Sequence, residues 1–263
     1  MPDLPASDPP DALVARLRAA GCVYAEDEAR LLVASTDDPH ELEDRVRRRV
    51  DGFPLEHIVG WVEFRGRRLR VDAGVFVPRW RTDFLAEQSI ARARRRSDPV
   101  VVELCCGVAA VASAIADDVP GARIYAADID PAATACAREN LGERGHVLEG
   151  DLYEPLPPAL AGHVDVLVAN APYVPSREIE TMPQEARLHE ASVALDGGDD
   201  GLDVQRRIAN EAGRWLSRGG SLLIETSERQ APQTAALMLD GGLVPRIGRS
   251  REHDATIVIG DRP

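Results

Sequence analysis

The feature that most constrains the fold is an alternation of strand-like and helix-like segments, which begins near residue 98 and continues to the end of the chain. The expected strands are short apolar runs at 100–104, 123–127, 146–149, 164–169, 221–225 and 256–259. Strands that are buried on both faces have nearly continuous apolar runs, because helices cover both sides of a parallel sheet. The pattern therefore predicts an α/β fold with a mostly parallel sheet.

The segment before residue 98 has a different pattern. Residues 11–50 carry apolar side chains at helical spacing and predict three short helices. Residues 62–71 alternate in polarity around Arg65-Gly66 and predict a hairpin. We therefore expect an N-terminal helical domain at 1–53, a hairpin linker at 54–77 and a catalytic domain at 78–263.

Composition excludes several classes of protein. The chain has 263 residues, no lysine and a net charge of −13, all of which falls after residue 97. Non-specific binding to nucleic acid needs clustered positive charge and is not expected. The sequence has no apolar run of about 18 residues, and residues 1–10 lack the apolar core of a secretory signal, so neither a membrane span nor secretion is expected. Four cysteines without zinc-site spacing predict reduced thiols in the cytoplasm and no metal site.

Acidic residues follow the expected strands at the sheet edge where ligands bind in such folds. Asp128 ends the second strand, 21 positions after Gly107. An acid at about this spacing can accept hydrogen bonds from both hydroxyls of a ribose. Asp151 follows the third strand and is placed to meet an adenine amino group. The alternative interpretation is that each acid only caps its loop.

The loop after the first strand contains a single glycine, Gly107, between Cys105 and Ala109. A dinucleotide-binding loop has three glycines and a P-loop has a lysine, and this loop has neither pattern. The sequence therefore favours a nucleoside ligand without a phosphate chain.

The most informative motif is Asn170-Ala171-Pro172-Tyr173, which follows the fourth strand. The lone pair of an amide or aniline nitrogen is delocalised, so a methyl transfer to it requires the nitrogen to be oriented. The Asn170 side-chain oxygen and the Ala171 carbonyl are suited to accept its two N–H groups and to stabilise the charge that develops. Tyr173 is suited to stack on the planar group. The alternative is a polar turn at the end of a strand.

Two further groups of residues make the chain resemble the HemK/PrmC glutamine methyltransferases, and most closely a divergent PrmC-related branch of unknown substrate. They are Pro54–Gly60 with Glu63-Phe64, Gly74, Val77-Pro78-Arg79 and Thr82, and Glu190 with the run from Ala194 through Leu202, Gly219-Gly220, Leu223, Glu225 and Gln230. The resemblance implies a Rossmann-like class I methyltransferase with a seven-stranded sheet. It also implies S-adenosylmethionine as cofactor and a protein glutamine as methyl acceptor, in a release factor or a ribosomal protein.

The resemblance assigns roles to positions in this chain. Catalysis is expected from Asn170, Ala171, Pro172 and Tyr173, and the N-terminal helices are expected to recognise the substrate protein. Cofactor contacts are expected from Glu103, Cys105, Gly107, Asp128, Ile129, Asp151, Leu152, Asn170, Pro78, Arg79 and Thr82.

The chain departs from the family pattern at several positions. The first loop has Cys105 and Ala109 where the family has glycine, which makes close backbone approach to the cofactor harder. Ala171 replaces a proline and keeps the backbone carbonyl, and Trp80 replaces another proline. Two alternative functions therefore stay open. One is a nucleic-acid amino-methyltransferase, which uses a similar motif on a flipped base, and the other is a degenerate nucleoside-binding module without catalysis.

Overall fold

The structure, a computed structural model, describes residues 9–263. Residues 1–8, which include most of the segment where no secretory signal is expected, lie outside this range. Four helices come first: α1 (Asp11–Ala19), α2 (Ala25–Ala34), α3 (Pro39–Val50) and α4 (Leu55–Val59). The three helices predicted over 11–50 are confirmed, whereas α4 was not predicted.

The four helices share a small apolar core that includes Leu17, Leu32, Val46 and Ile58. Because Ile58 belongs to α4, the packing of this bundle continues past residue 53. The division of the chain into domains at residue 53 stays a prediction.

A hairpin follows the bundle, as predicted. Strands β1 (Trp61–Phe64) and β2 (Arg67–Arg70) pair antiparallel. Arg65 and Gly66 form its two-residue turn with φ values of 51° and 76°. Positive φ at both turn positions matches the right-handed twist of a hairpin. Val62 and Leu69 are buried in the same core as one face of the large sheet, which anchors the hairpin there.

The α/β part begins with α5 (Thr82–Ala93), a helix that was not predicted. Its strands are β3 (Val100–Leu104), β4 (Arg123–Asp128), β5 (His146–Glu149), β6 (Val164–Ala169), β7 (Leu216–Thr226), β8 (Val244–Ser250) and β9 (Ala255–Asp261). Its other α-helices are α6 (Ala110–Asp118), α7 (Pro131–Leu141), α8 (Gln184–His189), α9 (Asp203–Trp215) and α10 (Ala231–Asp240).

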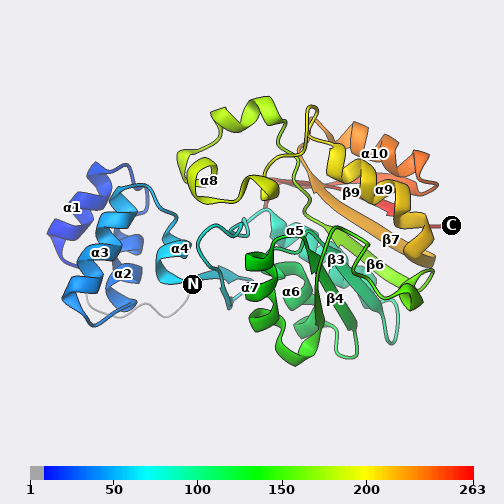
Figure 1. The fold of residues 1–263 in the computed structure, drawn as a ribbon, viewed down its shortest axis with the longest axis horizontal. Coiled ribbons are helices and arrows are strands. Elements are labelled where there is room, and N and C mark those ends of the chain that lie inside the picture. The colour runs from blue at the N-terminus through cyan, green and yellow to red at the C-terminus, as the bar shows by residue number, and fades with distance from the viewer. Residues whose placement is uncertain (1–8) are drawn as a thin grey trace.

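The seven strands form one sheet in the order β5-β4-β3-β6-β7-β9-β8. Strands β3 to β7 are mutually parallel, and β9 runs antiparallel to both of its neighbours. Helices α5, α6 and α7 contribute to the core on one face, and α9 and α10 contribute to the core on the other (Figure 1). The predicted mostly parallel sheet with helices on both faces is confirmed.

Two details of the sheet differ from the sequence expectation. The strand expected at 221–225 begins earlier than predicted, and Gly219-Gly220 lie within β7. The pairing of β6 with β7 shifts here, and a Cβ on Gly220 would lie 2.7 Å from the Val164 carbonyl oxygen. The glycines therefore permit a close backbone approach inside an irregular strand. The edge strand β8 was not predicted.

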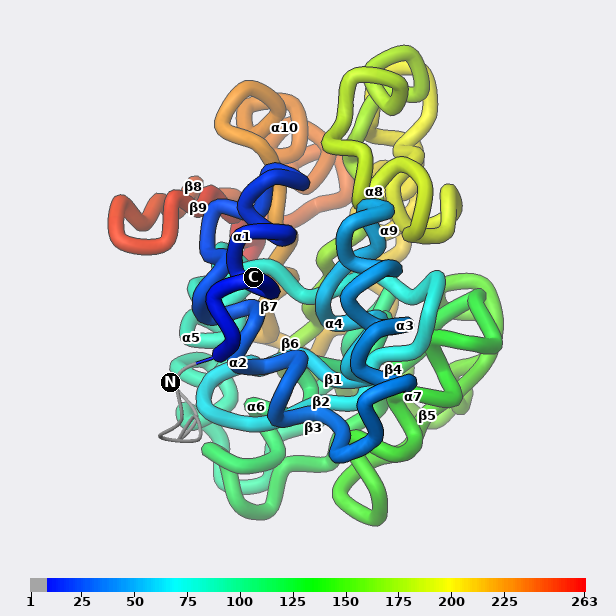
Figure 2. Tube along the Cα trace, turned by 90° about the vertical axis from the view of Figure 1, so that its left-hand side faces the viewer, coloured from blue at the N-terminus to red at the C-terminus, as the bar shows by residue number. Residues whose placement is uncertain are grey.

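The N-terminal bundle lies at one end of the molecule, beside the segment that contains α8 (Figures 1 and 2). Arg49 at the end of α3 forms an ion pair with Glu185 in α8, and the rings of Phe53 and His189 stack with centroids 4.0 Å apart. These contacts join the bundle to a segment that lines the cavity described next. Within residues 9–263, no helix is long and apolar enough to cross a membrane.

Candidate active site

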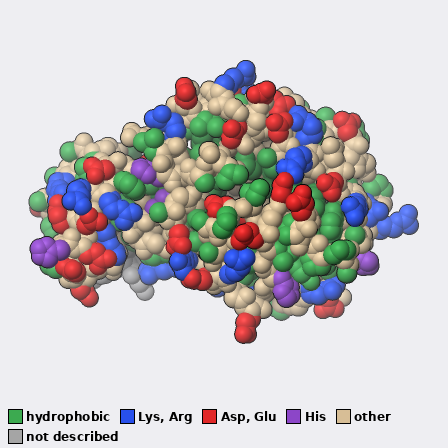
Figure 3. Space-filling model, in the orientation of Figure 1, with side chains coloured by type: hydrophobic (Ala, Val, Ile, Leu, Met, Phe, Trp, Pro, Cys, Tyr) green, Lys and Arg blue, Asp and Glu red, His purple; other side chains and the backbone are tan. Residues whose placement is uncertain are grey.

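A cavity of about 580 Å³ lies at the carboxyl ends of β3, β4 and β6, between the sheet and the segment that contains α8. Figure 3 shows a hollow in this region of the surface, with hydrophobic side chains around it. Every residue predicted for catalysis or cofactor binding lines the cavity: Pro78, Arg79, Thr82, Glu103, Cys105, Gly107, Asp128, Ile129, Asp151, Leu152, Asn170, Ala171, Pro172 and Tyr173. The structure thus brings the predicted residues together, and their individual roles stay predictions.

The loop between β3 and α6 keeps a glycine-like backbone although two of its glycines are replaced. Cys105, Gly107 and Ala109 have φ values of 52°, 53° and 58°. Left-handed φ costs an L-residue about 1–2 kcal/mol, so the cysteine and the alanine are held there by their surroundings. The replacements were expected to hinder a close approach to the cofactor, and this stays a prediction, while the backbone at all three positions has the left-handed φ that glycine adopts most easily.

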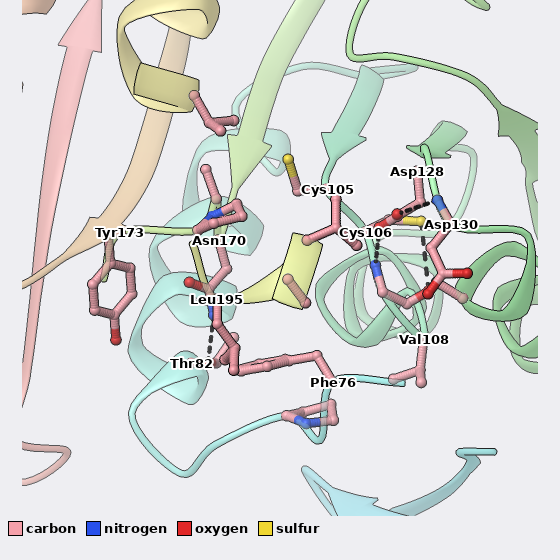
Figure 4. A pocket seen from close by; sticks show the side chains of 18 of the residues that line it. Phe76, Thr82, Cys105, Cys106, Val108, Asp128, Asp130, Asn170, Tyr173 and Leu195 are labelled. Carbon is pink, nitrogen blue, oxygen red and sulfur yellow. Dashed lines mark hydrogen bonds between the residues drawn. The ribbon is translucent and has the colours of Figure 1, made fainter. Parts of the chain in front are cut away.

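Asp128 connects two of the loops at the sheet edge. Its Oδ2 atom accepts a 2.8 Å hydrogen bond from the Gly107 amide, and Oδ1 accepts a 2.9 Å bond from the Asp130 amide (Figure 4). Burial raises the pKa of this carboxyl, and the backbone donors oppose that shift. Each oxygen has one lone pair left, which suits it to accept a hydroxyl of a ribose.

Asp151 is paired within the protein. Its Oδ2 atom accepts a 2.7 Å hydrogen bond from Arg207 of α9, a contact that the sequence did not indicate. Both residues line the cavity next to Leu152, which has a φ of 48°, and Ile129, whose side chain is exposed. These apolar side chains, together with the Asp151 carboxylate, suit the edge and faces of an adenine ring.

Glu103 lies deeper, beneath the loop. Its Oε2 atom accepts a 2.7 Å hydrogen bond from the Ala112 amide in the first turn of α6. Burial raises the pKa of Glu103 to about 8, despite this bond. The contact gives Glu103 a structural role in fixing α6 to the end of β3, which its place in the sequence does not indicate.

Asn170 is the first residue after β6. Its Nδ2 atom donates a 3.4 Å hydrogen bond to the Oγ1 atom of Thr82, the first residue of α5. Figure 4 shows Asn170 between Tyr173 on one side and Cys105 on the other. Thr82 was predicted to contact the cofactor, which stays a prediction, and its hydroxyl accepts the hydrogen bond from this amide.

A glycine-rich loop at 195–202 supports the backbone of residues 172–174. The amide of Gly197 donates a 2.9 Å hydrogen bond to the Val174 carbonyl. A Cβ on Gly201 would lie 2.4 Å from the Tyr173 carbonyl oxygen, so this position excludes any side chain. The same carbonyl accepts a 2.9 Å bond from Gln230 Nε2. Residues far apart in the sequence thus fix the course of the Asn170–Tyr173 motif.

Arg79 lies at the rim of the cavity. It forms an ion pair with Glu190, whose side chain is fully buried, and its guanidinium lies 5.2 Å from the centroid of the Phe76 ring. Burial raises the pKa of Glu190, and the Arg79 charge opposes that shift. Arg79 therefore fastens the segment around Glu190 to the residues that follow the linker, and its expected contact with the cofactor stays a prediction.

Several cavity residues were not predicted, namely Phe76, Arg81, Met182, Val193, Leu195 and Val204. They come from the linker, the segment before α5, the α8 segment and α9, and no strand tip marks them. Leu195 lies in the run from Ala194 through Leu202 that carries the family resemblance, and this is a signal that could have found it. Between residues 9 and 263 no group of three or more His, Cys, Asp and Glu residues is arranged to hold a metal ion.

The cavity fits S-adenosylmethionine. Its volume lies within the range of about 300–1,000 Å³ of small-molecule sites. Asp128 has acceptor capacity for the ribose, and the side chains of Ile129 and Leu152 flank the expected adenine position. The turn at Gly107 has no atom within 4 Å of a virtual Cβ, which leaves room for the methionine part of the ligand.

Comparison with known proteins agrees with this geometry. A family model described as "Methyltransferase small domain" matches residues 68–200. The chain is 38% identical over 236 residues to a release factor glutamine methyltransferase of Mycolicibacterium smegmatis, covering 88% of this chain and 82% of that protein. It is 36% identical over 198 residues to a 4-amino-L-phenylalanine/4-methylamino-L-phenylalanine methyltransferase of Streptomyces pristinaespiralis, covering 73% of this chain and 67% of that protein. A methyltransferase from Pyrococcus furiosus shares the fold with a TM-score of 0.57 at 14% identity, over 84% of this chain and 98% of that one.

Proposed function

The chain belongs to the HemK/PrmC family of S-adenosylmethionine-dependent methyltransferases, and from this premise we propose that it methylates the side-chain amide nitrogen of a glutamine in a protein. The observation that carries the proposal is the position of Asn170 at the cavity, next to the Ala171 carbonyl and opposite the cofactor loop. Two acceptors at this place match the two N–H groups of a primary amide.

When bound, S-adenosylmethionine supplies an electrophilic methyl group. Asn170 Oδ1 and the carbonyl oxygen of Ala171 accept the two N–H groups of the glutamine amide and so direct the nitrogen lone pair toward the methyl carbon. The bound cofactor would supply its methyl group to this nitrogen with the sulfur as leaving group, and the methylated amide would release one proton to water. The positive charge on nitrogen is stabilised by the same two oxygens.

Tyr173 and Pro172 complete the acceptor side. Tyr173 packs its ring beside Asn170, where it can cover the planar amide. Pro172 shapes the turn, which the 195–202 loop supports from behind. The Ala171 replacement leaves the acceptor in place, because the interacting group is a backbone carbonyl.

A release factor is the acceptor protein that the relatives' names favour. The N-terminal bundle is the part we assign to substrate recognition. Its contacts through Arg49 and Phe53 with α8 support this role, because α8 residues Glu185 and Ala186 line the cavity. A cytoplasmic location is part of the same proposal.

An aromatic amine is the second candidate acceptor. The Streptomyces pristinaespiralis relative is named for methylation of 4-amino-L-phenylalanine, whose nitrogen is also planar and delocalised. Phe76 and Tyr173 provide aromatic surface in the cavity. The same pair of acceptors serves either substrate, so the surroundings of the nitrogen decide between them.

The test has two stages. Calorimetric titration of the full chain with S-adenosylmethionine measures cofactor binding. Methyl transfer from labelled S-adenosylmethionine is then measured on a bacterial release factor, on its Gln→Glu variant at the Gly-Gly-Gln sequence, on 4-amino-L-phenylalanine and on duplex DNA and ribosomal RNA.

Micromolar cofactor binding and label that depends on the glutamine would support protein glutamine methylation. Label on the amino acid alone would favour the aromatic amine, and label on nucleic acid would favour an amino-methyltransferase of bases. Cofactor binding without transfer to any acceptor, or no binding, would contradict the proposal and favour a binding module.

A further inference from the structure

Glu225 is a buried carboxylic acid next to the site that the mechanism above does not use. It lies near the end of β7, and its side chain is on the face of the sheet that α5 covers, since Leu223 on the same face belongs to that core. Ala169 of β6 pairs with Ile224 of β7, so Asn170 and Glu225 are the next residues on adjacent parallel strands. Glu225 is 1% exposed.

Thr82 meets both residues from α5. Its hydroxyl accepts the 3.4 Å hydrogen bond from Asn170 Nδ2, and it is 3% exposed. The side chains of Thr82 and Asn170 lie near the Glu225 carboxyl, and together with the Arg81 charge they partly offset the effect of burial on the Glu225 pKa. The Oε2 atom of Glu225 has no partner among the described residues. The three side chains form one polar group between α5 and the ends of β6 and β7.

The direction of the hydrogen bonds follows from chemistry. Above a pH of about 7, where Glu225 is ionised, its carboxylate only accepts hydrogen bonds, so the single proton of the Thr82 hydroxyl points toward Glu225. The Thr82 lone pairs then accept from Asn170, and only the NH₂ group of the amide can donate to them. A flipped amide would place Asn170 Oδ1 against two acceptors and leave them unsatisfied in a buried position.

We propose that Glu225 and Thr82 are positioning residues that fix the orientation of the Asn170 amide, with its NH₂ group toward α5 and its oxygen toward the methyl acceptor. The inference rests on the proposed function in one respect, namely that Asn170 Oδ1 receives an N–H of the acceptor. It assigns Thr82 to the acceptor side of the site instead of the cofactor side. It also accounts for a buried acid that neither packing nor cofactor binding explains.

The substitutions Thr82→Val and Thr82→Ser separate this role from packing. Valine keeps the shape of threonine and removes the hydroxyl, whereas serine keeps the hydroxyl and leaves a small cavity. We expect kcat for glutamine methylation to fall by about 10- to 100-fold in Thr82→Val and Glu225→Gln, with the cofactor Kd within about 3-fold of wild type. Thr82→Ser is expected to keep most of the activity. Ser89→Ala, which removes another buried hydroxyl from α5, serves as the matched control.

A spectroscopic measurement needs no acceptor. The chain has three asparagines, at positions 140, 170 and 210, so protein labelled with ¹⁵N-asparagine gives three side-chain NH₂ signals. The Asn170 signal is identified by its loss in Asn170→Ala. We expect its protons to exchange slowly with water in wild type and in Thr82→Ser, and at least about 10-fold faster in Thr82→Val and Glu225→Gln.

The results distinguish the two levels of proposal. Greater activity and slower exchange in Thr82→Ser than in Thr82→Val would support the positioning role. The reverse order, or wild-type exchange in both Thr82→Val and Glu225→Gln, would overturn it. If wild-type protein transfers no methyl group to glutamine, the proposed function fails, and the exchange data still decide whether Thr82 and Glu225 orient the amide.

Discussion

The backbone amide of Gly107 donates a 2.8 Å hydrogen bond to the Oδ2 atom of Asp128, and this bond joins the loop after β3 to the end of β4. The same carboxylate also holds the Asp130 amide at the start of α7. Asp128 thus joins two of the loops that border the cavity, and we propose that its remaining lone pairs accept the ribose hydroxyls. These two tasks would explain why an acid is kept at a position where burial raises its pKa.

Replacing Asp128 tests this double role. Asp128→Asn keeps the size of the side chain but replaces one of its two oxygens with an NH₂ group. The NH₂ group cannot accept a hydrogen bond from a backbone amide or from a ribose hydroxyl. We expect the Kd for S-adenosylmethionine to rise by about 10-fold or more, because hydrogen bonds to a charged group contribute about 1.5–3 kcal/mol. Calorimetric titration measures the change. Asp254→Asn, a surface replacement away from the cavity, is the control, and an unchanged Kd in Asp128→Asn would contradict the assignment.

Asn170→Ala separates catalysis from cofactor binding. We expect kcat to fall by about 10²–10³-fold, which is typical for loss of one group that stabilises developing charge. The Kd for S-adenosylmethionine should stay within a few fold, since the Asn170 oxygen acts on the acceptor nitrogen. Labelled methyl transfer and calorimetry give the two quantities. Equal losses in turnover and cofactor affinity would refute the assigned role.

The left-handed Ala109 predicts an unusual response to glycine. Ala109 and Ala110 are both buried neighbours, and replacing either by glycine removes one methyl group. At Ala109, with φ of 58°, glycine also relieves backbone strain, whereas at Ala110 it weakens the first turn of α6. We expect Ala109→Gly to be more stable than Ala110→Gly by about 1–2 kcal/mol in chemical denaturation. Equal free energies of unfolding would show that the loop carries no such strain.

Two buried glutamates make stability depend on pH. Burial raises the pKa of Glu103 to about 8 and that of Glu225 to about 7, from an ordinary value of 4.5. Between about pH 4.5 and these two pKa values, the folded state binds more protons than the unfolded state. The contribution of the two glutamates to the free energy of unfolding is therefore complete below pH 4.5, and it is lost as the pH rises through 7 to 8. We expect the free energy of unfolding to decrease from pH 5.5 to pH 8.5.

The matched variants for this prediction are Glu103→Gln and Glu225→Gln, which cannot titrate. The free energy of unfolding of each variant should decrease less than that of wild type between pH 5.5 and pH 8.5. Other groups that titrate in this range affect wild type and variant alike, so their effect drops out of the difference. Denaturant titrations at several pH values supply the data. A wild-type slope that both variants reproduce would mean that neither glutamate carries the effect.

The strands of the sheet centre and the residues at their tips were predictable from the sequence, because a strand buried on both faces has an apolar run that ends at a polar tip. Asp128 and Asn170 are examples. The edge strand β8 escaped prediction because its residues from Val244 to Ser250 are largely exposed or half-buried and include a proline, two arginines and a glycine. Its pairing with β9, not its own pattern, makes it a strand.

The contacts across the site were not predictable for a different reason. Arg207 pairs with Asp151 from a helix 56 positions away, and Thr82 meets Asn170 across 88 positions. Single-sequence patterns describe local geometry and the edge of a sheet, but they do not place a helix residue against a given loop. The resemblance to a family marked Thr82 and Glu225 as notable positions, and only the fold shows that they lie next to the same amide.

The loop from Cys105 to Ala109 shows which property is preserved when the glycines of a binding motif are replaced. The backbone angles remain while the residues that normally permit them are replaced by small side chains. A search for this loop by its glycines would therefore pass over such chains, whereas a search by backbone conformation would find them. Divergent members of a family can thus remain competent to bind a shared ligand after the residues of the motif that identifies the binding loop have changed.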